Sequence, residues 1–191
     1  MISHKHKCIF IHYPKTGGET INFHLCGERH PKDKHAKLSG YNSKFENYFK
    51  FTFARNPFDQ VVSFYFHLRR KPHFTPDYSR RIANDSSFSD YCKLIIQQAP
   101  RFRDNQWYNP HYSYLLDKNN KTNIDFIGRF ENFEKDFYRM CDLLGIKNQK
   151  LSHKNKSKHK HYTEYYDDET REIVAKRYAK DIKYFGYKFG G

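Results

Sequence analysis

The segment Pro14–Thr20 combines residue types that can bind a phosphate or sulfate group. It follows a short apolar run and reads Pro-Lys-Thr-Gly-Gly-Glu-Thr. A strand, a glycine turn and the start of a helix bring several backbone N–H groups to one point, where the helix dipole adds partial positive charge. Lys15 would add a full charge, and Thr16 and Thr20 would add hydroxyl donors. The segment therefore predicts an oxyanion cradle; the alternative is an ordinary turn with a solvated lysine.

A second cation, Arg55, stands in the tripeptide Arg-Asn-Pro that ends at Pro57. An arginine directly after a strand and before a helix can hold a phosphate through two parallel hydrogen bonds. Ser63 follows further along the same predicted helix. Taken alone, Ser63 reads equally well as a small residue on a packing face.

The pattern differs from the common nucleoside-triphosphate loop, in which a lysine follows the glycines and a Ser or Thr binds magnesium. Here Lys15 precedes Gly17 and Gly18. Arg55 stands where a magnesium-binding aspartate would be expected. Two cations without a carboxylate predict phosphate or sulfate chemistry that needs no metal.

Alternating strand and helix patterns must position these residues. Apolar runs predict strands at Lys7–Tyr13, Phe49–Ala54 and Ile124–Gly128. Helical spacing predicts helices over about Gly18–Cys26, Pro57–Arg70, Ser87–Gln98, Phe130–Leu144 and Asp167–Lys183. Residues 27–47 and 71–86 read as irregular. This order predicts an α/β fold with a central parallel sheet flanked by helices, and both cationic loops then follow strand ends, where such sheets bind ligands.

The chain has 191 residues and a formal net charge of +14, from 35 Lys and Arg against 21 Asp and Glu. That length predicts one domain over residues 1–191. No apolar run approaches the roughly 18 residues of a spanning helix, and the start lacks the pattern of a signal peptide.

The net positive charge favours an anionic partner, such as nucleic acid, anionic lipid, an acidic glycan or a nucleotide, although it also serves solubility. The four cysteines, too far apart for a zinc site, read as reduced core thiols.

Several stretches of the sequence resemble one known enzyme family. The stretch Ile9–Ile21, IFIHYPKTGGETI, resembles the 5′-phosphosulfate loop of sulfotransferases that use 3′-phosphoadenosine 5′-phosphosulfate (PAPS). Tyr48–His67 resembles their 3′-phosphate element, with its spaced Arg and Ser. Phe126–Phe137 and Tyr178–Phe189 are similar to glycan-type and bacterial members. The resemblance covers nearly the whole chain and implies a P-loop-like nucleotide-binding architecture.

The resemblance also implies site residues. Lys15 matches the lysine that contacts the sulfate and the bridging oxygen. Arg55 and Ser63 match the pair that holds the 3′-phosphate. The residues that match the 5′-phosphate loop are Thr16, Gly17, Gly18 and Thr20. Glu19 departs from the pattern, since many members carry Thr there, and we expect it to point away and to offer only its backbone N–H.

The reaction needs a general base near the sulfate. In related enzymes that base lies between the first loop and the 3′-phosphate strand. Here the window holds His24, Glu28, His30, His35 and Glu46. The string KHAKLSGY resembles a segment of bacterial relatives, so the resemblance favours His35, with His30 as the alternative.

The basic run Lys147–His161 reads either as a solvated loop or as the family's loop over the 3′-phosphate and adenine. In the second reading Asn155, Lys156 and Ser157 contact the donor. Asn155 begins an N-glycosylation sequon, and a glycan there would obstruct the donor site. This favours a compartment without glycosylation, and the expected location is a bacterial-type cytoplasm.

Taken together, these expectations describe a metal-independent O-sulfotransferase that sulfates a hydroxyl of a carbohydrate or glycolipid. It would use PAPS and release PAP, the nucleotide that remains when PAPS has lost its sulfuryl group. Neither a specific nucleic acid nor a membrane span is expected, and membrane contact would be peripheral. The acceptor pocket is expected from residues 27–47, 71–86 and 99–120, where four aromatic residues form either a wall that stacks on sugar rings or part of the core: Trp107, Tyr108, Tyr112 and Tyr114. The alternatives are a basic module that binds glycan or nucleic acid without catalysis, and a P-loop-type kinase.

Overall fold

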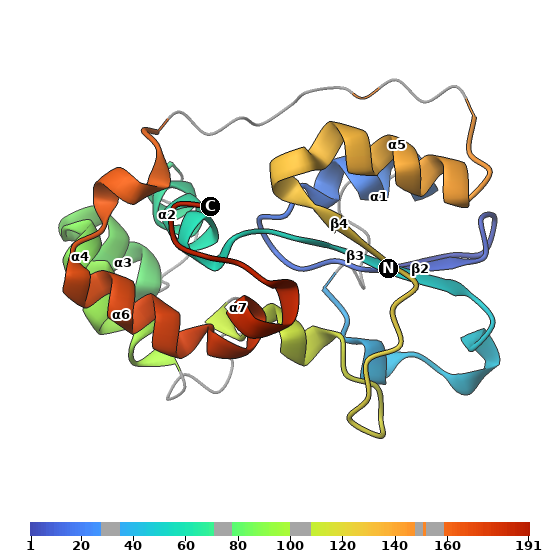
Figure 1. The fold of residues 1–191 in the computed structure, drawn as a ribbon, viewed down its shortest axis with the longest axis horizontal. Coiled ribbons are helices and arrows are strands. Elements are labelled where there is room, and N and C mark those ends of the chain that lie inside the picture. The colour runs from blue at the N-terminus through green and yellow to red at the C-terminus, as the bar shows by residue number, and fades with distance from the viewer. Residues whose placement is uncertain (28–34, 71–77, 100–107, 148–150, 152–158) are drawn as a thin grey trace. The chain divides into compact units, whose positions relative to one another are not determined.

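The computed structural model describes residues 1–27, 35–70, 78–99, 108–147, 151 and 159–191 (Figure 1). These residues form two compact units. The first comprises Met1–Arg55 and His111–Lys154, and the second comprises Asn56–Pro110 and Asn155–Gly191. The expectation of one domain over 1–191 stays a prediction.

The first unit contains a four-stranded sheet with the order β1-β2-β3-β4. Its strands are β1 (Ile2–Ser3), β2 (Cys8–Ile11), β3 (Phe49–Ala54) and β4 (Phe126–Arg129). β2, β3 and β4 are parallel, whereas β1 pairs antiparallel with β2. The prediction of a parallel sheet was therefore wrong at this edge. The turn between β1 and β2 is too short for the crossover connection that a parallel pair needs.

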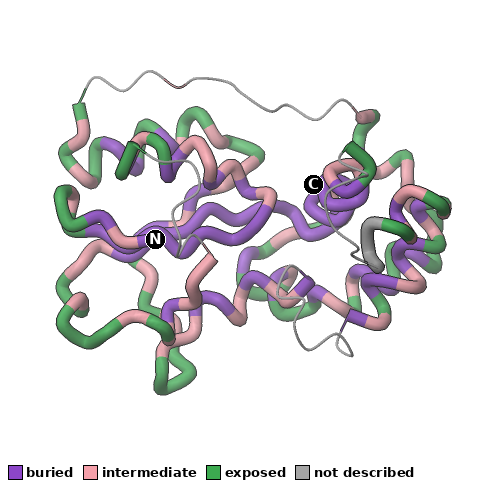
Figure 2. The backbone as a smooth tube through the Cα atoms, turned by 180° about the vertical axis from the view of Figure 1, so that it is seen from behind, coloured by how far each residue is buried: buried purple, intermediate pink, exposed green. Residues whose placement is uncertain are grey.

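Two helices, α1 (Gly18–Cys26) and α5 (Phe133–Leu143), cover one face of this sheet (Figure 1). The face is built from aromatic side chains, because Phe10, Phe51 and Phe53 point from adjacent strands into the same buried cluster. Figure 2 shows buried residues, in purple, along these strands. β3 has the predicted bounds, and α1 begins and ends where the sequence predicted.

The second unit is helical in its described residues. Its helices are α2 (Pro57–Arg69), α3 (Tyr78–Asp85), α4 (Phe88–Tyr91), α6 (Asp168–Arg177) and α7 (Ala179–Phe185), with a π-helical segment at Cys92–Ile96. Val61, Tyr91, Ile95 and Val174 belong to one buried core that these elements share.

Two helix predictions in this unit were wrong. The loop expected over 71–86 contains α3, a short and largely polar helix with the sequence YSRRIAND. The guanidinium of Arg69 donates a 2.9 Å hydrogen bond to the carbonyl of Ala83. This tertiary contact could not be predicted from the sequence. The single last helix is interrupted at Tyr178, whose φ of −108° and ψ of 24° leave the helical region.

Candidate active site

The loop after β2 has an unusual backbone. Lys15 has φ 66° and Gly17 has φ 81°, both in the left-handed region. Gly17 is the N-cap of α1 and supplies no side-chain cap. The first-turn N–H groups therefore have no capping side chain, which is the condition under which a helix start binds an anion.

Aromatic rings explain why two adjacent glycines are needed. A Cβ on Gly17 would lie 2.4 Å from Cε2 of Phe133, and a Cβ on Gly18 would lie 2.0 Å from Nε2 of His12. Neither ring was identified as part of the site from the sequence. The signal was present in the glycine pair itself, since adjacent glycines at a helix start indicate a close approach by another group.

Thr16 supports the loop from within. It is fully buried, and its hydroxyl donates a 2.7 Å hydrogen bond to the carbonyl of Tyr13. The Tyr13 ring stacks on His111, with centroids 4.5 Å apart and planes inclined by 8°. Because the hydroxyl proton of Thr16 is used here, its main-chain N–H is the donor that suits an anion.

Arg55 reaches the same loop from β3. Because β2 and β3 are parallel, with Ile11 paired to Thr52, their carboxyl ends lie at one edge of the sheet. Nη1 of Arg55 donates a 3.0 Å hydrogen bond to the carbonyl of Lys15. The guanidinium lies 4.1 Å from the centroid of Phe130, and Arg55 is only 7% exposed. The two predicted cations therefore lie on neighbouring strand ends, with Arg55 in contact with the loop backbone.

His35 is held by a hydrogen bond to His12, the residue that directly follows β2. Its Nδ1 lies 3.1 Å from the carbonyl oxygen of His12, and the two imidazole centroids are 4.6 Å apart. A carbonyl only accepts, so Nδ1 of His35 carries the hydrogen. In the neutral ring Nε2 is then the nitrogen that can take a proton, as a general base requires.

Among the other candidates for the base, His24 lies elsewhere. It stands in the last turn of α1, and its ring packs 4.9 Å from that of Phe137 in the helix layer. Glu28 and His30 lie outside the described residues. Of the described histidines in the window, His35 is the one in contact with a residue that touches the loop.

His111 is a further histidine that the sequence did not single out. Thr52 donates its hydroxyl proton to the carbonyl of Ile11 at 2.8 Å, so its oxygen accepts from Nε2 of His111, also at 2.8 Å. Burial lowers the pKa of His111 to about 3. It is therefore neutral at physiological pH and supports the sheet beneath Tyr13.

The remaining predicted residues are placed as follows. Glu19 and Thr20 lie in the first turn of α1, both partly exposed. Ser63 is 3% exposed on α2, in the second unit. Asn155, Lys156, Ser157 and Trp107 lie outside the described residues. Tyr108 and Tyr114 are buried, as a core role predicts, and Tyr112 is partly exposed.

Within the described residues, no cluster of three or more His, Cys, Asp or Glu side chains is arranged to hold a metal ion. No helix among those residues has the length and apolar character to cross a bilayer.

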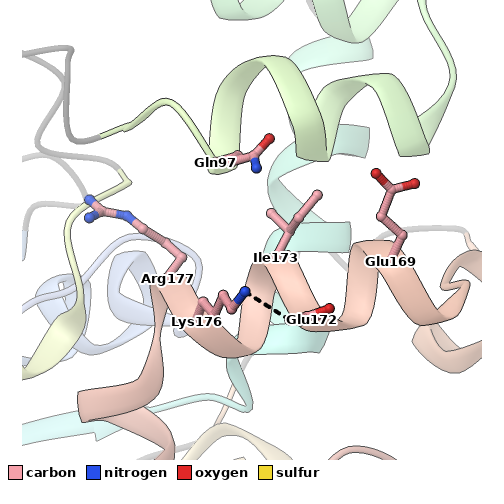
Figure 3. A pocket seen from close by; sticks show the side chains of 6 residues that line it. All are labelled: Gln97, Glu169, Glu172, Ile173, Lys176 and Arg177. Carbon is pink, nitrogen blue, oxygen red and sulfur yellow. Dashed lines mark ion pairs between the residues drawn. The ribbon is translucent and has the colours of Figure 1, made fainter.

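A cavity of about 520 Å³ lies in the second unit, beside α6 (Figure 3). Its charged groups are engaged with protein partners. Lys176 pairs with Glu172 at 2.8 Å, and Nη2 of Arg177 donates a 2.7 Å hydrogen bond to the carbonyl of Tyr108. The lining residues are Gln97, Glu169, Glu172, Ile173, Lys176 and Arg177. Such internally paired charges do not define an anion site.

Comparisons with known proteins identify the family of this chain. The model of the sulfotransferase family matches residues 1–188, and the chain belongs to that family. It is 24% identical to carbohydrate sulfotransferase 10 of Xenopus laevis over 98% of this chain and 66% of that protein. It is 25% identical to carbohydrate sulfotransferase 11 of Mus musculus over 55% of this chain and 35% of that protein.

An uncharacterized protein of Archaeoglobus fulgidus is 32% identical over 53% of this chain and 72% of its own length. No solved structure matches the chain significantly. The chain thus covers just under two thirds of one carbohydrate sulfotransferase and about a third of the other.

Proposed function

We propose that this chain transfers the sulfuryl group of PAPS to a hydroxyl group of a carbohydrate or glycolipid. The observation that carries the proposal is the hydrogen bond from Arg55 to the carbonyl of Lys15, which brings the guanidinium to the loop before α1. Family membership supports sulfuryl transfer. The names of the two animal relatives support carbohydrate as the acceptor class.

The loop suits the 5′-phosphosulfate group. A Cβ at Gly17 or Gly18 would overlap with a neighbouring ring, so neither position can carry a side chain. The backbone amides of the two glycines are therefore not covered by side chains of their own. Lys15 would contact the sulfate and the bridging oxygen. Glu19 would contribute its N–H, with its carboxylate turned outward. The proposed contacts of the 5′-phosphate come from Thr16, Gly17, Gly18, Glu19 and Thr20.

The 3′-phosphate is assigned to Arg55 and Ser63. The planar guanidinium of Arg55 can hold a phosphate through two parallel N–H donors, and it also donates to the carbonyl of Lys15. Ser63 is assigned from the resemblance alone, as are Asn155, Lys156 and Ser157.

When bound, PAPS supplies an activated sulfuryl group, and its transfer to the acceptor oxygen leaves PAP. The chain's part is to hold charge and move one proton. His35, through Nε2, takes the proton of the acceptor hydroxyl. Lys15 and the loop amides stabilise negative charge on the sulfuryl and bridging oxygens. Preorganised donors of this kind need no reorganisation as charge develops, and no metal is assigned a role.

The proposal also includes the architecture of the first unit and the cellular location of the protein. The parallel strands β2–β4 with a helix following the β2 loop support a P-loop-like architecture for the first unit. A cytoplasmic location rests on the sequon at Asn155, which a glycosylating compartment would modify.

The test combines binding and transfer. PAP should raise the melting temperature of the protein without added magnesium, and ³⁵S-labelled PAPS should transfer label to a member of a panel of glycans, glycolipids, tyrosyl peptides and phenols. Stabilisation by ATP with magnesium but not by PAP would favour a kinase. Salt-sensitive binding of RNA or an anionic glycan, without any transfer, would favour a binding module.

A further inference from the structure

We infer that His12 is a positioning residue that selects the tautomer of His35. The inference rests on the proposed function only where it calls His35 the base. His12 directly follows β2 and is 3% exposed. Its carbonyl and its imidazole both contact His35, and its imidazole also lies against the donor loop.

The imidazole of His12 is enclosed on several sides. It stacks on Phe10, with centroids 5.3 Å apart and planes inclined by 10°. Its Nδ1 lies 3.4 Å from Nδ2 of Asn22 on α1. Its edge occupies the position that a Cβ on Gly18 would take. These contacts hold the ring at one place between the strand end and the helix start.

The His35 ring packs on this fixed ring. At a centroid distance of 4.6 Å and an inclination of 45°, the two imidazoles are in direct contact. The contact restrains rotation of the His35 side chain, while Nδ1 points to the carbonyl of His12 at 3.1 Å. One residue therefore supplies both the hydrogen-bond acceptor and the surface that keeps the ring turned toward it.

The consequence is chemical. In a neutral histidine, the hydrogen bond made by one nitrogen decides which nitrogen keeps its lone pair. With Nδ1–H held by the carbonyl of His12, Nε2 keeps the lone pair. Loss of the His12 ring leaves the carbonyl in place but frees the His35 ring to turn, so that both tautomers become populated.

The experiment is ¹⁵N NMR of the full chain with labelled histidine at pH 8, above the ordinary histidine pKa of about 6.5. His35→Ala assigns the His35 signals. In the natural sequence His35 should show the pattern of a single Nδ1–H tautomer. In His12→Ala its two nitrogen shifts should move toward one another as the tautomers average. His12→Phe keeps a flat ring against Phe10 and should keep the Nδ1–H pattern.

His24→Ala is the matched control, because it removes another histidine of the first unit that packs on Phe137. It should leave the His35 pattern unchanged. If His12→Ala does not fold, His12→Leu keeps apolar volume without the flat ring and serves instead. An Nε2–H pattern in the natural sequence overturns the inference. So does an unchanged pattern in a folded His12→Ala or His12→Leu protein, or a lost pattern in His12→Phe.

Calorimetry with PAP separates this inference from the proposed function. If PAP fails to bind the natural sequence, the donor assignment falls while the tautomer result stands. If PAP binds and the His35 pattern does not depend on His12, the inference falls alone.

Discussion

The guanidinium of Arg55 donates a 3.0 Å hydrogen bond to the carbonyl of Lys15, a residue with φ 66°. The arginine is thus part of the scaffold that holds the loop, besides being a cation near it. The phenyl ring of Phe130, 4.1 Å from the guanidinium carbon, keeps the arginine plane in place. If Arg55 holds the 3′-phosphate as proposed, donor binding and loop conformation depend on the same side chain.

Arg55→Ala should weaken PAP binding and also slow transfer. Loss of a charge-assisted bidentate contact costs on the order of 1.5–3 kcal/mol, which is roughly 10- to 150-fold in PAP affinity. Turnover at saturating PAPS should fall too, because the Lys15 carbonyl loses its donor.

Arg55→Lys is the informative comparison, since it keeps the charge but loses the planar fork. It should recover part of the affinity and little of the turnover. Calorimetry with PAP and saturation kinetics with labelled PAPS measure the two effects. Unchanged PAP affinity in Arg55→Ala would refute the phosphate role.

Three glycines allow backbone strain and steric overlap to be separated. Gly18→Ala should abolish PAP binding through overlap with the His12 ring, since its φ is not positive. Gly27→Ala meets no atom within 4 Å but has φ 77°, so it carries the conformational cost alone, about 1–2 kcal/mol. Gly17→Ala combines both effects and should be the least stable of the three.

Urea unfolding and PAP titration of each variant provide the measurement, with Gly40→Ala as the control that has open space and no positive φ. PAP binding by Gly18→Ala at the level of the Gly40→Ala protein would show that the close approach of His12 has no bearing on the loop.

The sequence was sufficient to predict β3, α1, α2 and the meeting of the Lys15 and Arg55 loops. Each depends on local signals: alternating aromatics for β3, the Asn-Pro start of α2, and the rule that parallel strands end at one edge. The choice of His35 as the base came instead from the family resemblance of its segment.

What escaped prediction depends on tertiary contacts. The edge strand β1 has two residues and no pattern of its own. The contact of His12 with His35 joins residues separated by a segment without periodicity. The packing of His12 and Phe133 on the glycine pair became visible only in three dimensions. The adjacent glycines indicate that some group approaches closely, but nothing in the spacing identifies which side chains do so.

Lys15→Ala should remove most turnover and leave the fold intact, because the lysine is proposed to act where charge develops on the bridging oxygen. Loss of one preorganised donor typically lowers the rate by about 10²–10³. PAP lacks the sulfate, so its affinity should fall less than turnover does. Lys44→Ala, at an exposed lysine over Phe45, is the control. Equal losses in the two variants would mean that the effect is one of net charge.

His35→Ala should leave PAP affinity nearly intact and abolish the pH-dependent rise in turnover. A base must be neutral to accept a proton, so turnover of the natural sequence should rise as the pH rises through the range in which histidines titrate. The measurement is transfer from labelled PAPS between pH 5 and 9. Normal turnover in His35→Ala, with loss in His30→Ala, would move the base to His30.

The last prediction concerns acid stability and rests on His111. Burial lowers its pKa in the folded protein to about 3, whereas the unfolded chain has the ordinary value near 6.5. Below pH 6.5 the unfolded state therefore binds a proton that the folded state refuses, and the free energy of unfolding falls with pH. The loss of unfolding free energy approaches about 1.4 kcal/mol per pH unit until the pH nears the pKa of the folded state.

His111→Phe keeps a ring against Tyr13 but cannot titrate. It should be less stable at pH 8, because Thr52 loses its donor, yet its stability should decline less between pH 7 and 5. Urea unfolding at pH 8, 7, 6 and 5 measures both curves. If the two proteins lose stability in parallel over that range, His111 is not the group that makes the natural protein acid-sensitive.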